Sequence, residues 1–261
     1  MIRDVIKKED KMEEDKQYYA RVHSIESFGS ADGPGVRFMV FLHGCPLRCQ
    51  FCHNPDTWGS KKYEEMSADQ ILRQALRYKN YWGTNGGITI SGGEPLLQID
   101  FLLELFKKAK AQGVNTCIDT SGGCFTREGE WFKKFEELMN YTDLLLVDIK
   151  EINDERHRVL TTKSNENILD MARYLSDINK PVWIRHVLVP ERSDYDEDLD
   201  QLNEFIKTLN NVEKVEVLPY HTLGVFKWEE LGIDYQLEGI QPPTAERVEN
   251  AHKRLHVEDY K

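Results

Sequence analysis

Short apolar runs rich in β-branched residues alternate along the chain with amphipathic segments of helical period. Such runs indicate buried strands, and they occupy residues 36–42, 87–90, 114–118, 144–147, 181–189 and 215–218. The helical segments occupy residues 68–78, 101–112, 166–176, 194–209 and 245–255, with Ser67, Ser164 and Thr244 as expected N-caps and Gly113 as an expected stop. The alternation predicts βαβ units and an α/β fold whose parallel sheet is a partial or full barrel, or an open doubly wound sheet.

The amino-terminal stretch differs from the rest of the chain. Residues 1–17 are mostly charged and lack the apolar face that a packed helix needs. We expect them to form a charged, flexible tail. Residues 18–261 are expected to form a single domain, because no long linker, low-complexity segment or internal repeat interrupts the alternation.

Composition limits the partners and the compartment. The 261 residues carry a formal net charge of −11, which argues against nucleic acid as the main partner because such binding depends on basic residues that neutralise phosphates. The first residues lack the pattern of a signal segment, and no apolar run is long enough to span a bilayer. Five cysteines are too few, and odd in number, for a disulfide framework. We therefore expect a protein of the reducing cytoplasm that binds neither nucleic acid nor a membrane.

Three cysteines form the most informative motif. Cys45, Cys49 and Cys52 have the spacing C-x3-C-x2-C, and no fourth cysteine follows nearby. Three thiolates on one loop can hold three irons of a [4Fe-4S] cluster and leave the fourth iron open to a small molecule, whereas electron-transfer clusters are normally closed by four cysteines. Structural zinc usually needs a second Cys or His pair, and His53 adjoins the loop without one. The motif predicts a catalytic iron–sulfur centre.

Polar side chains and glycines follow the predicted strands where these strands end. Because the carboxyl ends of parallel strands meet at one edge of a sheet, we expect these residues to share one site. They are Gly92-Gly93-Glu94-Pro95, Asp119-Thr120-Ser121-Gly122, Asp148, Lys150, Arg185, His186 and His221. Glycines let a ligand approach the backbone, the acids can hold a cation, and Lys150 or Arg185 can bind a ligand carboxylate. Taken singly, Gly92-Gly93 can equally be a simple turn, and Asp119 and Asp148 can be helix N-caps.

Together these motifs resemble the radical S-adenosylmethionine superfamily, through the cysteine spacing, Phe51 before the third cysteine, and the Gly92–Pro95 run. From residue 19 to the end, the chain also resembles the activating enzymes of glycyl radical enzymes. This second likeness is carried by Ser27-Phe28-Gly29, Asp32 to Arg37, Cys52 to Trp58, Leu218 to His221, Leu223-Gly224 and Lys227-Trp228. Many relatives with other partners have extra cysteine clusters before the Gly92–Pro95 run, and the activase of anaerobic ribonucleotide reductase is much shorter. Neither matches this chain, so the resemblance favours the group whose partner is pyruvate formate-lyase.

The resemblance implies a partial (βα)6 barrel with parallel strands and a radical reaction. S-adenosylmethionine would bind the open iron of the [4Fe-4S] cluster, and one electron would cleave it to methionine and a 5′-deoxyadenosyl radical. That radical would remove hydrogen from a backbone glycine of the partner and leave a glycyl radical. The resemblance further implies flavodoxin or ferredoxin as the electron donor, a monomeric enzyme and a role in anaerobic glucose metabolism.

The same resemblance assigns roles to single residues. Cys45, Cys49 and Cys52 would be the catalytic cluster ligands. The residues expected to bind S-adenosylmethionine are Phe51, Cys52, His53, Gly93, Ile152, Asn153, Asp154, Arg185, Val187 and His221. Those expected to hold a monovalent cation are Asp119, Thr120, Asp148 and the carbonyl of Leu146, where the family often has Met. Those expected to contact the partner's glycine loop are Asp32, Gly33, Pro34 and Gly35, whereas Cys117 and Cys124 would be structural.

Two alternatives stay open on the sequence. A non-catalytic iron–sulfur electron carrier or sensor would need only the cysteines, and it would not cleave S-adenosylmethionine. An activase of a different glycyl radical enzyme would share the whole site and differ in its partner.

Overall fold

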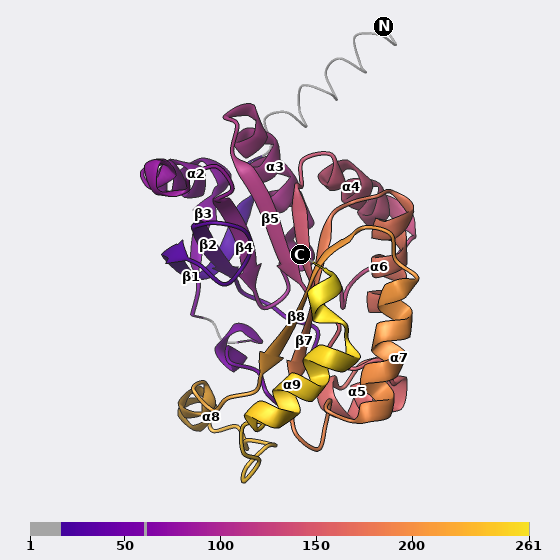
Figure 1. Cartoon of the computed structure of the whole chain (residues 1–261). Helices are drawn as coiled ribbons and strands as arrows, with labels where there is room; N and C mark the ends of the chain where they lie inside the picture. The colour runs from indigo at the N-terminus through magenta and orange to yellow at the C-terminus, as the bar shows by residue number, and fades with distance from the viewer. Residues whose placement is uncertain (1–16, 60–61, 261) are drawn as a thin grey trace, which may run out of the picture.

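The parallel strands predicted from the apolar runs are present. The computed structural model describes residues 17–59 and 62–260 (Figure 1). Within these residues, eight strands form one sheet in the order β3-β1-β2-β4-β5-β6-β7-β8. The strands from β2 to β8 in that order are parallel, with the bounds Arg37–Leu42 (β2), Gly87–Gly92 (β4), Asn115–Thr120 (β5), Leu144–Asp148 (β6), Val182–Leu188 (β7) and Val212–Pro219 (β8). The predicted α/β fold with a partial barrel of six parallel strands is confirmed.

Two antiparallel strands extend the sheet beyond β2, and the apolar runs did not predict them. β1 (Tyr19–Gly29) pairs with β2, and β3 (Glu64–Ser67) pairs with β1. Ala20 and Val22 of β1 are buried, whereas the residues on either side of each are more exposed. A strand that buries one face alternates between apolar and polar residues and lacks the continuous apolar run of a central parallel strand.

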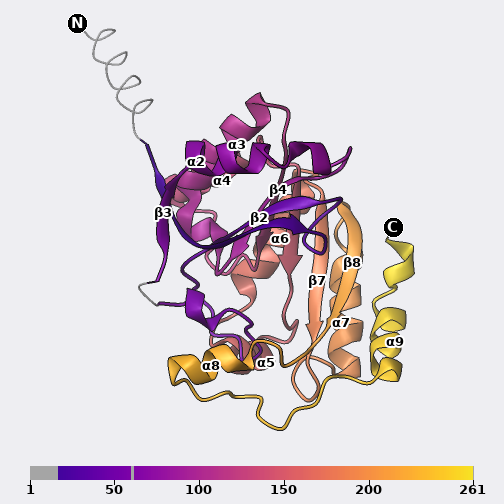
Figure 2. The ribbon, with the colours of Figure 1, turned by 90° about the vertical axis from the view of Figure 1, so that its left-hand side faces the viewer.

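Helices cover the outer face of the sheet (Figures 1 and 2). The helices of the described residues are α2 (Ala68–Leu76), α3 (Ile99–Ala111), α4 (Gly129–Met139), α5 (Asp154–Thr161), α6 (Glu166–Asp177), α7 (Asp196–Lys207), α8 (Val225–Leu231) and α9 (Ala245–Arg254). α8 does not cover the sheet and lies beyond the end of β8 (Figures 1 and 2). Short 3-10 turns lie at Pro55–Thr57 (η1), Lys79–Tyr81 (η2), Pro95–Gln98 (η3) and Val257–Asp259 (η4). α4, α5 and α8 were not predicted. α5 is polar and α8 is short, whereas α4 is an amphipathic helix of 11 residues that the sequence analysis missed.

The predicted helix ends are mostly correct. Ser67 and Thr244 each accept a hydrogen bond from the backbone N–H three residues further on, at the starts of α2 and α9. Gly113 follows α3 in the left-handed region, at φ +66°, where glycine carries no steric cost. Asn165, not Ser164, is the N-cap residue of α6. The Ser164 hydroxyl nevertheless accepts a hydrogen bond from the first N–H of that helix at 3.2 Å.

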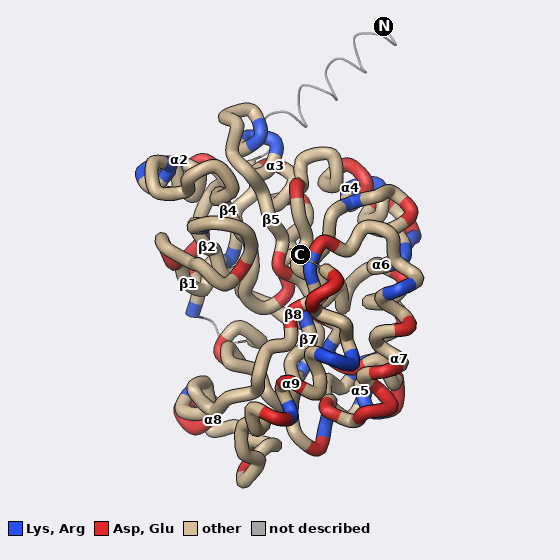
Figure 3. The backbone as a smooth tube through the Cα atoms, viewed as in Figure 1, with Lys and Arg blue, Asp and Glu red and all other residues tan. Residues whose placement is uncertain are grey.

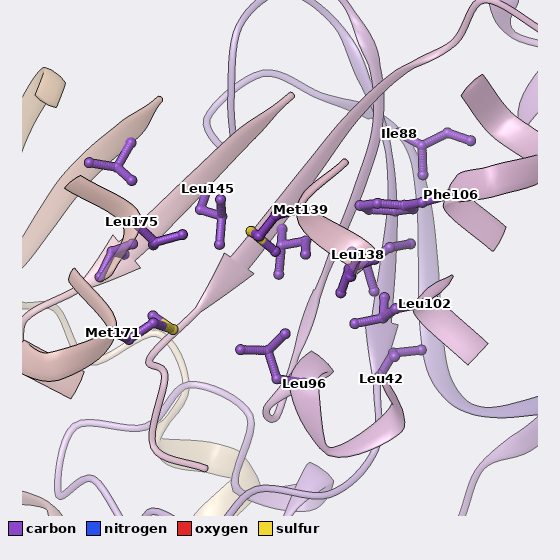
Figure 4. Packing of buried hydrophobic residues seen from close by; sticks show 14 of the residues in the cluster. Leu42, Ile88, Leu96, Leu102, Phe106, Leu138, Met139, Leu145, Met171 and Leu175 are labelled. Atoms are coloured by element: carbon purple, nitrogen blue, oxygen red, sulfur yellow. The ribbon is translucent and has the colours of Figure 1, made fainter. Parts of the chain in front are cut away.

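Two apolar clusters hold the site in place. The main core packs the outer face of the sheet against the helices (Figure 4), and Leu42, Ile88 and Phe106 are fully buried there. Each such side chain stabilises the fold by about 1.5–3 kcal/mol. A second cluster surrounds the cysteine loop and consists of Leu47, Cys49, Phe51, Leu160, Val189, Tyr220 and Leu237. The loop is therefore packed on apolar side chains from four other segments of the chain.

The charged tail predicted for residues 1–17 lies outside the described residues, apart from Gln17. The single domain predicted for residues 18–261 stays a prediction, although one continuous sheet links the strands from Tyr19 to Pro219. In the part of the chain that the structure describes, no helix is both long and apolar enough to cross a membrane.

Candidate active site

A cavity of about 460 Å³ opens at the carboxyl ends of the parallel strands. Its walls come from strand ends and from the cysteine loop, as expected for a parallel α/β sheet. The predicted site residues that line it are Asp32, Cys45, Cys49, Phe51, Cys52, His53, Gly93, Asp119, Thr120, Asp148, Arg185, Val187 and His221. Residues from position 32 to position 221 thus meet around one space.

Other predicted site residues do not line this cavity; they are Gly33, Pro34, Gly35, Leu146, Ile152, Asn153 and Asp154. The side chain of Asn153 caps α5 by accepting a hydrogen bond from the N–H of Arg156 at 3.1 Å. The carboxylate of Asp154 accepts the Ser164 hydroxyl at 2.7 Å. These two side chains hold the start of α5, so their expected roles toward the cofactor stay predictions.

The cysteine loop between β2 and η1 is fixed through its backbone. The N–H groups of Arg48 and Gln50 donate to the last carbonyls of α5, on Thr161 and Leu160, at 2.8 and 2.9 Å. A side chain at Gly93 would place its Cβ 2.1 Å from the carbonyl oxygen of Gly44. Only glycine at position 93 lets the end of β4 pack this closely against the loop.

The three thiols share a buried environment. Burial raises the pKa of Cys45 and of Cys49 to about 12, and that of Cys52 to about 11. The pKa of each thiol is raised further by the negative charge of one of the other two cysteines. Near neutral pH these thiols stay protonated despite the nearby positive charge of Lys150, whereas bound iron deprotonates a coordinating thiol. All three are free cysteines on the cavity wall, and this donor set suits an iron–sulfur cluster. In residues 17–59 and 62–260, no three His, Cys, Asp or Glu side chains are grouped to hold a single metal ion.

Glu94 joins the ends of β4 and β5. It is fully buried, and its carboxylate accepts the hydroxyls of Thr120 and Ser121, both at 2.6 Å. The backbone N–H groups of Ser121 and Leu96 also donate to it, each at 3.1 Å. Four donors satisfy this buried carboxylate, so the acid of the Gly92–Pro95 run is a cross-link of the scaffold. The hydroxyl of Thr120 is thereby directed to Glu94.

Arg185 on β7 binds three carboxylates at once. Its guanidinium contacts Asp32 at 3.0 Å, Asp119 at 2.8 Å and Asp148 at 3.0 Å. Lys150 holds the second oxygen of Asp148 at 2.9 Å. The sequence suggested separate roles for these residues, as cation ligands and as a carboxylate binder. In the structure they form one network, because β6 and β7 pair Asp148 with Arg185 in register.

Three acids and two bases leave this network one negative charge in excess. Burial alone would raise the pKa of Asp148, but Arg185 and Lys150 outweigh burial and lower that pKa to about 2. For Asp119, burial together with repulsion from Asp148 and Asp32 outweighs Arg185 and raises the pKa to about 6. The site therefore favours a cation or a cationic ligand beside Asp119.

The segment after β8 closes the cavity on the side of His53. The rings of His53 and His221 stack with centroids 4.1 Å apart, and Nε2 of His53 lies 3.2 Å from the His221 carbonyl oxygen. Trp228 on α8 donates from Nε1 to the Cys52 carbonyl at 2.9 Å. Lys227-Trp228, one of the motifs shared with the activating enzymes, therefore includes a residue that holds α8 against the cysteine loop.

Arg37 was not predicted as a functional residue, yet it fixes the segment that contains Asp32. Its side chain is fully buried, and its guanidinium donates to the Pro34 carbonyl at 3.1 Å and to the Asn85 carbonyl at 3.2 Å. A Cβ on Gly33 would lie 2.8 Å from Cδ of Arg37. The sequence signal was a charged residue inside an apolar strand run, which indicates either an exposed edge or a buried network.

Comparison with known proteins agrees with this site. A sequence profile described as "Radical SAM superfamily" matches residues 39–206. The chain therefore belongs to the radical SAM superfamily, whose members use a [4Fe-4S] cluster and S-adenosylmethionine. It is 57% identical over 241 residues to the pyruvate formate-lyase-activating enzyme of Streptococcus mutans, which covers 92% of each chain. It is also 57% identical over 242 residues to the enzyme of that name from Listeria monocytogenes, which covers 92% of this chain and 98% of the other. Within the superfamily, the chain belongs to the pyruvate formate-lyase-activating enzymes.

A solved structure gives the same result. The crystal structure of a domain of pyruvate-formate lyase-activating enzyme from Bacteroides vulgatus superposes with a TM-score of 0.54 at 27% identity. The match covers 67% of this chain and 94% of that chain. Recognition of the superfamily and of the activating-enzyme family from sequence motifs is confirmed.

Proposed function

We propose that this protein activates pyruvate formate-lyase by reductive cleavage of S-adenosylmethionine and removal of hydrogen from a backbone glycine of the partner. The observation that carries the proposal is the convergence of three free cysteines, Gly93 and the Arg185 network on one cavity. The identity of 57% to enzymes of that name supports the choice of partner. A simple electron carrier would need the cysteines and no such cavity.

Cys45, Cys49 and Cys52 are the proposed ligands of three irons of the cluster, which supplies one electron and an open coordination position when bound. Gly93 lines the cavity, and its backbone is the proposed contact for the amino group of the ligand. Lys150 uses one N–H on Asp148, and a lysine ammonium has three donors. Lys150 therefore keeps donors for the carboxylate of S-adenosylmethionine. Arg185 uses one N–H each of Nε, Nη1 and Nη2 on the three aspartates, and the second N–H of Nη1 and of Nη2 is also left for a ligand, because a guanidinium has five N–H donors.

The aromatic side of the cavity suits the adenine. Phe51, His53 and His221 line this wall, and flat rings offer stacking surface to a base. Val187 adds an apolar contact on β7. These residues hold the nucleoside in the proposal, and water is displaced from the reacting centre when the ligand fills the cavity.

A monovalent cation is proposed beside Asp119 and Asp148, with the carbonyl of Leu146 and Thr120 as further ligands. Support comes from the excess negative charge of the network of Asp32, Asp119, Asp148, Lys150 and Arg185. A cation there offsets repulsion between the acids and also neutralises a ligand carboxylate. Binding would require Asp119 to share its carboxylate between Arg185 and the ion.

The segment Asp32–Gly35 is the proposed contact for the partner's glycine loop. Asp32 lines the cavity and pairs with Arg185, so this segment borders the place where hydrogen is removed. We further propose flavodoxin or ferredoxin as the electron donor, a monomeric enzyme and a cytoplasmic location.

The proposal is tested with the anaerobically reconstituted protein, S-adenosylmethionine, dithionite and pyruvate formate-lyase. The expected result is the electron spin resonance doublet of a glycyl radical on the partner, together with 5′-deoxyadenosine. Cleavage of S-adenosylmethionine without a radical on this partner, but with one on another glycyl radical enzyme, would assign a different partner. No cleavage with any partner would contradict the enzymatic activity.

A further inference from the structure

Four large apolar side chains are exposed on the segment that follows β8. Leu223 is 77% exposed, Phe226 53%, and Leu231 and Ile233 38% each. No other stretch of similar length in the described residues exposes as many large apolar side chains. Large apolar side chains that are exposed close together along one segment commonly mark an interaction site. We call these four residues the α8 patch.

The side of α8 that faces away from Phe226 is held against the segment that follows Cys52. Phe226 and Trp228 are two positions apart, so they face opposite sides of a helix with about 3.6 residues per turn. Trp228 is buried and donates to the Cys52 carbonyl at 2.9 Å. Lys227 donates to Oδ1 of Asn54 at 2.7 Å. The helix thus buries the side of Trp228 on the segment that begins with the third cysteine and presents Phe226 to solvent. Leu231, three positions after Trp228, lies nearer the buried side and is partly exposed there.

The α8 patch borders the mouth of the cavity. His221, which lines the cavity, is two residues before Leu223. A Cβ on Gly224 would lie 2.7 Å from Cα of His53, so the two backbones touch at the rim. In Figures 1 and 2, α8 projects from the body at the end where β7 and β8 finish. A protein that inserts a segment into the cavity must pass close to this helix.

We propose that the α8 patch is the docking surface for the body of the partner protein whose glycine segment enters the cavity. The inference rests on the proposed function, which requires a folded partner to be held at this mouth during hydrogen removal. A second copy of the chain on the same patch would stand at the mouth and obstruct the partner. The partner is therefore a protein of different sequence.

The charges around the patch specify the chemistry of the partner's surface. Glu229, Glu230 and Asp234 are exposed beside the apolar residues, and acidic residues mark this segment in Figure 3. An apolar centre with a charged rim is the usual anatomy of a protein interface. The matching surface has an apolar hollow for Phe226 and basic residues around it.

The experiment compares a full partner with a short glycine-loop peptide, with dithionite as reductant. Phe226→Glu is expected to raise KM for full-length pyruvate formate-lyase about tenfold or more, the size of a central interface contact. KM for the peptide and partner-free cleavage of S-adenosylmethionine should change less than about twofold. Ile233→Glu should act in the same direction, and Phe226→Leu should restore most of the affinity. Val159→Glu is the matched control, because Val159 is 63% exposed on α5 and the substitution adds the same charge.

The other outcomes separate the possible occupants. If wild-type protein activates the partner and both glutamate variants keep its KM, the docking proposal is wrong while the proposed function stands. A defect that appears only with a protein electron donor would assign the patch to that donor. A concentration-dependent dimer in sedimentation that Phe226→Glu dissolves would assign it to a second copy. Absence of radical formation by wild-type protein on both peptide and partner would instead refute the proposed function.

Discussion

Replacement of Arg37 by Lys is expected to loosen the segment that carries Asp32. The guanidinium donates to the carbonyls of Pro34, Asn85 and Ile88 and to the side chains of Thr89 and Asn115. Lysine has three donors, so at least two of these five acceptors lose their partner. A buried acceptor without a partner costs about 1–3 kcal/mol, and we expect a loss of about 2–4 kcal/mol of stability.

The assay combines thermal unfolding with peptide binding, both anaerobic. A loss of this size lowers Tm by about 5–15 °C in a protein of this length. Affinity for a glycine-loop peptide should fall, because Pro34 lies in the loosened segment, while partner-free cleavage of S-adenosylmethionine falls less. A Tm within about 2 °C of wild type, with unchanged peptide affinity, would refute the role assigned to Arg37.

Three further outcomes are expected. Cys45→Ala should leave less than about one tenth of the S-adenosylmethionine cleavage, measured by product assay. Its iron content should fall below the roughly four irons per chain of a reconstituted cluster. Cys124→Ala should retain both the cleavage and the iron. Asp119→Asn should reduce the dependence of activity on the monovalent salt supplied and weaken ligand binding; an unchanged salt response in kinetics would dismiss the cation site. Burial, and then repulsion from Asp198, raise the pKa of Glu151 from 4.5 to about 7. The folded chain then binds more protons than the unfolded chain between these values, so stability falls as pH rises through this range, and Glu151→Gln should flatten that slope in thermal unfolding.

Elements could be predicted from the sequence where the residues of one segment alone identify its structure. β2, β4 and β6 of the parallel sheet are almost wholly buried, so each is a nearly continuous apolar run that can be recognised without knowledge of its neighbours. β1 buries one face, and α5 is mostly polar, so neither stands out from its surroundings. The cysteine motif and Gly93 were found because each lies in a short contiguous motif that can be recognised without knowledge of the fold.

Contacts between distant residues were not predictable in this way. Arg185 was expected to bind a ligand carboxylate, yet it holds Asp32, Asp119 and Asp148. That pairing depends on strand register and on the path of the segment before β2, which no local pattern encodes. Arg37 donates hydrogen bonds to residues that are 48 to 78 positions away in the chain. The anchoring of α8 by Trp228 likewise depends on a contact across 176 positions.

Transfer of hydrogen from the partner's glycine to 5′-deoxyadenosine is the step that defines the proposed reaction. Pyruvate formate-lyase containing α-deuterated glycine is incubated anaerobically with the reconstituted protein, dithionite and S-adenosylmethionine, and the 5′-deoxyadenosine is analysed by mass spectrometry. We expect one deuterium in the product, in proportion to the glycyl radical measured by electron spin resonance. Formation of 5′-deoxyadenosine without deuterium, while the partner carries no radical, would contradict the proposed reaction.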